Sequence, residues 1–123
     1  VLPERENPEN KLQKLGYTES AAACICGAET LNPKIPSNVD AKALSDMNDY
    51  WQEKYGMTVY GPVGLDLAIS KESVEHKHYP YAYAGEADIL LVPNYEVGNA
   101  IGKAMTAVLY PVYLNGRKTA PFT

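Results

Sequence analysis

Several features are scarce in this 123-residue chain, and each scarcity argues against one kind of site, partner or segment. The 2 cysteines are too few for a disulfide framework, and the 2 histidines are too few for a histidine metal centre. Acidic residues outnumber basic ones by 15 to 11, so the net charge of -4 gives no reason to expect nucleic acid or an anionic membrane as a partner. No apolar run approaches the roughly 20 residues that a transmembrane helix needs.

The remaining composition is that of a soluble globular protein, with 46% hydrophobic and 21% charged residues. The two cysteines stand as Cys24-Ile25-Cys26, too close along one predicted strand to form an easy bridge. We therefore expect free thiols that pack in the core of a cytoplasmic protein. The first ten residues, VLPERENPEN, are polar and interrupted by proline, so we expect no signal peptide there.

Residues 1–16 are expected to form an arm or loop, because their prolines and asparagines discourage regular structure. Residues 17–123 are expected to form a single domain. Its first element, within SAAACICGAET (20–30), has the length of a buried strand, although the alanines also allow a helix. The segment 31–40 is predicted to be a loop. Asp40 then serves as the predicted N-cap of a helix that Gly56 stops.

The second half of the chain continues the alternation of strands and helices. MTVY (57–60) is predicted to be a short strand closed by Gly61-Pro62, and a helix, or a turn followed by a helix, leads to Pro80. ADILLV (87–92) is continuously apolar, which indicates a strand covered on both faces.

The last segments complete the pattern. YEVGNAIGKAMTAVLY (95–110) carries apolar residues at helical spacing, and 111–123 is predicted to hold a strand, an Asn-Gly turn and an extended tail. Such alternation is typical of an α/β fold, a three-layer sandwich with a mainly parallel sheet and right-handed crossovers.

In an open parallel sheet, ligands bind beyond the carboxyl ends of the strands. Two segments lie there by this interpretation: YGPVGLD (60–66) and VPNYEVGN (92–99). Their glycines let a backbone approach a ligand, and their helix N-termini present free N–H groups to an anion such as phosphate or a carboxylate. The same residues also serve as turn formers, helix caps and packing positions, so the composition alone leaves both interpretations open.

Two other short motifs resemble ligand-binding patterns but do not fit them. GNAIGK (98–103) has one residue too few between its glycines for a phosphate-binding P-loop, and Ala104 stands where that motif needs Ser or Thr. In His76-Lys77-His78 the two imidazoles point in different directions on a helix, and Lys77 repels a cation. We therefore expect no metal site, and no motif identifies a catalytic residue.

Three ordered blocks resemble the phosphate acetyl/butyryltransferases, and the phosphate butyryltransferase branch most of all. ETLNPKIPSNVDAKALSDM is similar to the family's Glu-x-x-Asn-Pro-Lys-Met-Pro segment, and GPVGLDLAISKESVEHKHY to its Gly-Pro-x-x-x-Asp-x-Ala-Ile-Ser block. AGEADILLVPNYEVGNAIGKAMT matches its Gly-Asp-Ala-Asp-Ile-Leu-Leu-Val-Pro block. The similarity extends from about residue 18 to 106, and the joint match of three blocks is specific.

The resemblance implies the reversible transfer of an acyl group between coenzyme A and inorganic phosphate, with the coenzyme A thioester as substrate and no separate cofactor. Family members have two α/β domains with the substrates between them, and they commonly form homodimers. The matched blocks correspond mostly to the second domain. By that analogy, the residues that line or shape the site are Gly61, Pro62, Asp66, Asn94, Glu96, Gly98 and Asn99.

The chain also departs from the family pattern. Relatives are longer, with a domain before the matched segment, and their Ser-Arg segment after the last core strand has no counterpart before Thr123. Asn94 stands where many relatives have Asp. Phosphate attack on a thioester needs cations, so we expect this chain alone to be incomplete or inactive as an acyltransferase. Two alternatives remain: a non-catalytic module that binds phosphate or coenzyme A, and a purely structural α/β domain.

Overall fold

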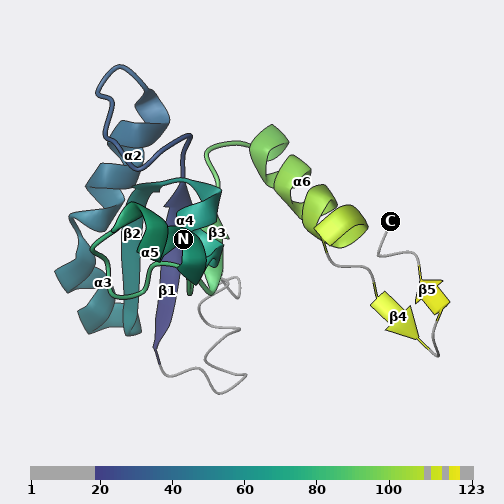
Figure 1. Ribbon diagram of the computed structural model, residues 1–123. Coiled ribbons are helices and arrows are strands. Elements are labelled where there is room, and N and C mark those ends of the chain that lie inside the picture. Colours follow the sequence, from purple (N-terminus) through teal and green to yellow (C-terminus); the bar gives the residue numbers. More distant parts are fainter. Residues whose placement is uncertain (1–18, 110–111, 115–116, 120–123) are drawn as a thin grey trace, which may run out of the picture. The chain divides into compact units, whose positions relative to one another are not determined.

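The computed structural model describes residues 19–109, 112–114 and 117–119 (Figure 1). The chain divides into two compact units, one extending to Leu91 and the other beginning at Val92, and each is described by itself. The arm expected over residues 1–16 lies outside the described residues. Its separation from a domain over 17–123 therefore stays a prediction.

The first unit is built on a parallel sheet of three strands in the order β2-β1-β3 (Figure 1). The strands are β1 Ser20–Ile25, β2 Met57–Val63 and β3 Ile89–Leu91. Ala22 of β1 lies opposite both Val59 of β2 and Ile89 of β3, which fixes the register of all three strands. The expected α/β fold with a parallel sheet is confirmed, and the alanine-rich first segment is a strand.

Every residue of β1 is buried. Because successive side chains of a strand point to opposite faces, Ala22 and Cys24 lie on one face, and Ala21, Ala23 and Ile25 on the other. The first face packs against the helices α2 Pro36–Ser45 and α3 Asn48–Tyr55 through Ala41, Leu44 and Trp51. No disulfide joins the two cysteines, as predicted, and burial raises the pKa of Cys24 to about 11.

The other face is covered by α4 Leu65–Ile69, and α5 Lys71–Lys77 packs against α4. Leu67 and Ala68 of α4 are fully buried, and their carbonyls accept hydrogen bonds from Gly85 (2.7 Å) and Ala87 (3.0 Å). These bonds tie the segment before β3 to the helix layer. The first unit therefore has the predicted three layers, with α2 and α3 on one side of the sheet and α4 and α5 on the other.

The prediction of one continuous helix beginning after Asp40 was wrong in two respects: where the helix begins, and that it is unbroken. The structure has two helices, and α2 begins at Pro36, inside the segment expected to be a loop. Proline suits the first turn of a helix because its fixed φ is helical and its missing N–H needs no partner there. Gly56 ends α3 in a left-handed conformation, φ 64°, as predicted.

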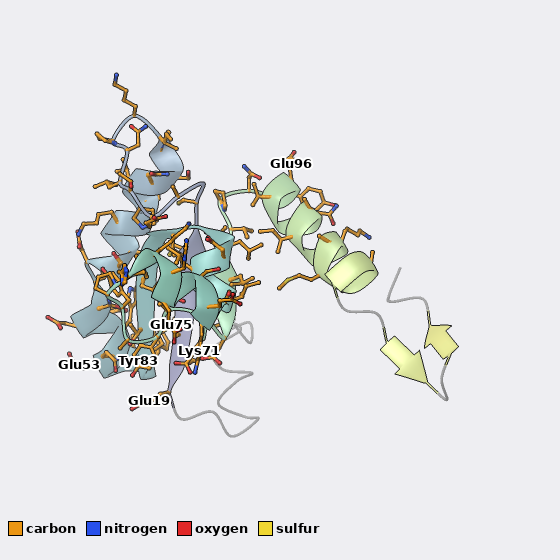
Figure 2. All side chains as sticks on the ribbon, viewed as in Figure 1. Glu19, Glu53, Lys71, Glu75, Tyr83 and Glu96 are labelled. Atoms are coloured by element: carbon orange, nitrogen blue, oxygen red, sulfur yellow. The ribbon has the colours of Figure 1, made fainter. Side chains whose placement is uncertain are left out.

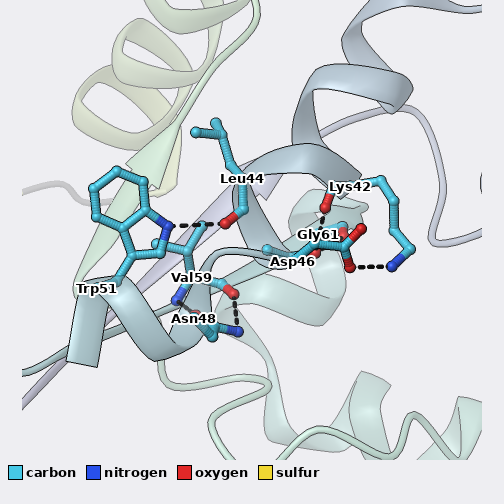
Figure 3. A network of polar contacts seen from close by, with 8 residues as sticks. Lys42, Leu44, Asp46, Asn48, Trp51, Val59 and Gly61 are labelled. Carbon is cyan, nitrogen blue, oxygen red and sulfur yellow. Dashed lines mark hydrogen bonds and ion pairs between the residues drawn. The ribbon is translucent and has the colours of Figure 1, made fainter. Parts of the chain in front are cut away.

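The side chain of Asn48 fastens the first residue of the second helix to β2. Its amide nitrogen donates to the carbonyl of Val59 (2.8 Å), and its amide oxygen accepts from the backbone N–H of Val59 (2.7 Å) (Figure 3). The amide thus makes the two hydrogen bonds that a neighbouring strand would make to β2. Across the same break, the indole of Trp51 donates to the carbonyl of Leu44 (2.8 Å).

The strand β2 is longer than predicted, because Gly61-Pro62 does not close it. The strand continues to Val63, whose carbonyl accepts from the backbone N–H of Cys26 (2.8 Å). The pairing shifts register between Ala23 and Ile25, opposite the cis Gly61-Pro62 bond. A Cβ at Gly61 would lie 2.7 Å from the Cβ of Cys24, so only glycine fits between the two strands here.

The apolar segment 87–92 is a strand, as predicted, although only Ile89–Leu91 pair with β1. Asp88 ends the ladder: its backbone N–H donates to the carbonyl of Ala21 (2.8 Å), and its carboxylate accepts from the N–H of Ala21 (2.9 Å). The expected cover on both faces was wrong for Leu91, which is 46% exposed. Among the described residues β3 pairs with β1 alone, so it lies at an edge of the sheet.

The second unit holds the predicted helix, α6 Tyr95–Ala104, which continues as the π-helical segment η1 Met105–Leu109. Two short strands follow, β4 Val112–Leu114 and β5 Arg117–Thr119, paired as an antiparallel hairpin. The expected Asn-Gly turn between them lies outside the described residues. Within the parts of the chain that the structure describes, no helix is both long and apolar enough to cross a membrane.

We expect Asn48→Ala to lower the free energy of unfolding by about 2 kcal/mol, because it removes two hydrogen bonds and leaves two backbone groups of Val59 without partners. Urea unfolding of the full chain, followed by circular dichroism, measures this. Glu53→Ala, at an exposed position of the same helix, is the control and should stay within about 0.5 kcal/mol of the parent. Equal effects of the two substitutions would contradict the assigned role of Asn48.

The two glycines of α6 should respond differently to alanine. A Cβ at Gly98 would lie 2.7 Å from Cγ2 of Val92, whereas one at Gly102 would meet nothing within 4 Å. Gly102→Ala should therefore stabilise α6 by about 0.5–1 kcal/mol. Gly98→Ala should give no net stabilisation, because the new methyl group forces the side chain of Val92 out of its position. Amide hydrogen exchange over residues 95–104 measures the change in the stability of α6 for each variant. Equal protection in the two variants would disprove the close contact with Val92.

Candidate functional site

The carboxyl ends of β1 and β2 lie at the same edge of the sheet because the two strands are parallel. The chain leaves β1 through Cys26 and Gly27 into the loop that leads to α2, and it leaves β2 through Gly64 directly into α4. The hydrogen bond from the N–H of Cys26 to the carbonyl of Val63 joins the two exits. Residues that follow either strand are therefore neighbours at this edge.

Three charged side chains meet there. The ammonium nitrogen of Lys77 lies 2.8 Å from a carboxylate oxygen of Asp66 and 4.0 Å from one of Glu29. Glu29 follows β1, Asp66 lies in the first turn of α4 after β2, and Lys77 lies in the last turn of α5. We call these three residues the edge cluster. The side chains of Lys77 and Asp66 are 40% and 44% exposed, so small solutes can reach them.

The electrostatics of the edge cluster are set mainly by one hydrogen bond. The bond from Lys77 lowers the pKa of Asp66 and raises the pKa of Lys77 itself. The backbone N–H of Leu67 also donates to the Asp66 carboxylate and lowers its pKa further. Asp66 is therefore ionised at neutral pH and unsuited to act as a general base, while Lys77 keeps its positive charge.

Two of the predicted site residues, Gly61 and Pro62, are buried within β2. They cannot offer an exposed side chain to a ligand. What they do is shape the end of β2, since Gly61 permits the close approach to Cys24, and its carbonyl accepts from the hydroxyl of Ser45 (3.2 Å). Asp66 is the predicted residue of the first unit whose side chain is accessible.

The other four predicted residues, Asn94, Glu96, Gly98 and Asn99, lie in the second unit, at the start of α6. The side-chain oxygen of Asn94 accepts from the N–H of Val97 (2.9 Å), which makes Asn94 the N-cap of this helix. Figure 2 shows Glu96 pointing away from the first turn, and Asn99 is also exposed. Gly98 is the position where the helix approaches Val92.

Sequence reasoning missed Glu29 and Lys77 as members of this edge. Glu29 opens the first of the three sequence blocks and Asp66 belongs to the second, so the structure unites residues of two blocks. The missed signal was available: a charged residue just after each of two parallel strands. In the sequence, Lys77 is one of three lysines, with Lys71 and Lys103, that the matched blocks offer as cations, and the sequence does not distinguish it from the other two. Among the described residues, no group of three His, Cys, Asp or Glu side chains is arranged to hold a metal ion.

The chain matches the family model described as phosphate acetyl/butaryl transferase over residues 6–108. It is 46% identical over 92 residues to phosphate butyryltransferase from Clostridium acetobutylicum, a match covering 75% of this chain and 30% of that protein. It is 37% identical over 91 residues to phosphate acetyltransferase from Thermotoga maritima, covering 74% of this chain and 31% of that protein.

A solved structure agrees with these matches. The crystal structure of a branched-chain phosphotransacylase from Enterococcus faecalis V583 superposes with a TM-score of 0.73 and 42% sequence identity, over 84% of this chain and 36% of that one. This chain thus spans only about a third of the length of the relatives it matches. The family model nevertheless covers all three sequence blocks and most of this chain. The chain belongs to the phosphate acetyl/butyryltransferase family.

Proposed function

We propose that this chain supplies part of the active site of a phosphate acyltransferase of the phosphate butyryltransferase type. The observation that carries the proposal is the 46% identity to a phosphate butyryltransferase, against 37% to the phosphate acetyltransferase of Thermotoga maritima. The substrates would be an acyl-coenzyme A and inorganic phosphate, with no further cofactor. The protein would act in the cytoplasm, and the family suggests a homodimer.

The proposed reaction is a displacement at the thioester carbonyl. A phosphate oxygen attacks the carbonyl carbon, the carbon–sulfur bond breaks, and the products are an acyl phosphate and the thiolate of coenzyme A, which takes up a proton. The negative charge that develops on the carbonyl oxygen has to be stabilised by hydrogen-bond donors or cations. Such groups must be fixed before the reaction, which favours donors on the ends of rigid elements.

The proposed contributions follow from where the residues lie. Gly61 and Pro62 shape the end of β2, Asp66 belongs to the edge cluster, and the start of α6 offers backbone N–H groups beside Asn94. Gly98 holds that turn close to Val92, and Glu96 and Asn99 are its exposed polar side chains. These seven residues are proposed to bind or orient substrates, and none of them is proposed as the group that forms a covalent bond.

We expect the full 123-residue chain to bind coenzyme A in calorimetry, and to form butyryl phosphate far more slowly than the relative from Clostridium acetobutylicum at equal concentration. The reason is that the match covers only 30% of that enzyme, so most of its length has no counterpart in the aligned residues. Butyryl phosphate is measured as its hydroxamate, with butyryl-CoA and acetyl-CoA compared and with phosphate omitted as control.

Three results would count against the proposal or one of its parts. Absence of heat with coenzyme A at millimolar concentration would leave only a structural role for this chain. A rate equal to that of the relative would show that the aligned third is sufficient for activity, contrary to the expected dependence on further parts of the fold. A preference for acetyl-CoA would retain the family reaction and reject the butyryltransferase assignment.

A further inference from the structure

Within the edge cluster, Lys77 makes two unequal contacts. The 2.8 Å separation from Asp66 is a charge-assisted hydrogen bond, whereas the 4.0 Å separation from Glu29 is too long for one. An ammonium group has three N–H donors, and Asp66 accepts one of them. Two N–H donors of Lys77 are thus not used by Asp66. Glu29 is attracted to them by charge but accepts no hydrogen bond from them.

The two carboxylates also differ in how firmly they are fixed. Asp66 lies in the first turn of α4 and accepts a backbone hydrogen bond from Leu67 in addition to that from Lys77. Glu29 lies in the irregular loop between β1 and α2, outside any helix or strand. Movement of Glu29 away from Lys77 would break no hydrogen bond between them, while movement of Asp66 would break several.

The charges of the edge cluster sum to about minus one, counting Lys77 as positive and Asp66 and Glu29 as negative at neutral pH. An anion that approaches Lys77 is therefore attracted by one group and repelled by two. The repulsion from Asp66 is permanent because that residue is fixed. The repulsion from Glu29 is relieved if the loop carries this side chain aside, which makes Glu29 the adjustable member of the cluster.

We propose that Lys77 is the residue that contacts phosphate at this edge of the sheet, that Asp66 positions its ammonium group, and that Glu29 occupies the anion position until phosphate replaces it. The inference rests on the proposed function, which makes phosphate a substrate. It changes the role expected for Asp66, which then acts through Lys77 and does not touch the substrate itself. It also gives the chain a cation in the part of the fold where the three sequence blocks provide no arginine.

A purely structural role for the edge cluster predicts something different. In that case Lys77 fastens the end of α5 to α4 and to the loop after β1, and phosphate has no preference for it. Removing any of the three charges would then change stability and leave phosphate binding unaltered. The response of phosphate affinity to removal of Glu29 separates the two roles, because that removal improves binding only if phosphate binds close to Glu29.

The test is titration of the full chain with inorganic phosphate, at pH 7.5 and constant ionic strength, by isothermal calorimetry or phosphorus NMR. Glu29→Gln should tighten phosphate binding about threefold, since it removes a like charge whose oxygen lies 4.0 Å from the ammonium nitrogen of Lys77. Lys77→Met should weaken binding at least tenfold, and Lys77→Arg should retain most of it. Asp66→Asn should weaken binding severalfold, because loss of the carboxylate that positions Lys77 outweighs the removal of a like charge.

A second ion pair serves as a matched control. Lys71, at the opposite end of α5 from Lys77, pairs at 2.6 Å with Glu86, which lies in the segment before β3. Lys71→Met and Glu86→Gln should leave the phosphate affinity unchanged. Circular dichroism and thermal unfolding of each variant confirm that a change in binding does not come from loss of the fold.

The outcomes divide cleanly. Unchanged or weaker phosphate binding in Glu29→Gln, or unchanged binding in Lys77→Met, would overturn the inference. Phosphate binding that depends on Lys77 without any butyryl phosphate formation would support this inference and reject catalysis by the chain. Butyryl phosphate formation at the same rate in Lys77→Met would support the proposed function and reject the role of Lys77.

Discussion

The fold depends on one constraint: β1 is buried along its whole length between two other strands and two layers of helices. Its three consecutive alanines allow both helix layers to approach the sheet, because a larger side chain on either face would push a layer away. Fully buried backbone must find hydrogen-bond partners, and the parallel pairing with β2 and β3 supplies them. The small central strand thus determines how closely everything else packs.

The parallel pairing of β1 and β2 also places their carboxyl ends at one edge of the sheet, where the phosphate-binding residues are proposed. The loops that follow parallel strands lie on one side of the sheet, and the hydrogen bond from Cys26 to Val63 joins two of them, so residues distant in sequence, such as Glu29 and Asp66, become neighbours. The edge cluster is assembled by the end of α5 reaching back to both exits. Its members are charged and at least partly exposed, in contrast to Gly61 and Pro62, which are buried within β2.

Much of this was predictable where the signal is local. Gly56 ends a helix because few other residues adopt its left-handed conformation, and Asn94 caps α6 because its side chain reaches the N–H of Val97. The errors arose where tertiary contacts decide. The break between α2 and α3 depends on the partner of Asn48 in β2, and the edge cluster depends on α5 packing against α4. The periodicity of the sequence does not report such contacts between elements that are distant along the chain.

The amide of Asn48 has a consequence for how this sheet could be enlarged. It occupies the outward-facing N–H and C=O of Val59, so another strand cannot add to the middle of β2 without first expelling a helix. The opposite border is different, because among the described residues β3 has β1 as its single neighbour. Any additional strand, from the same polypeptide or another molecule, would therefore be recruited beside β3, and the sheet has one direction of growth.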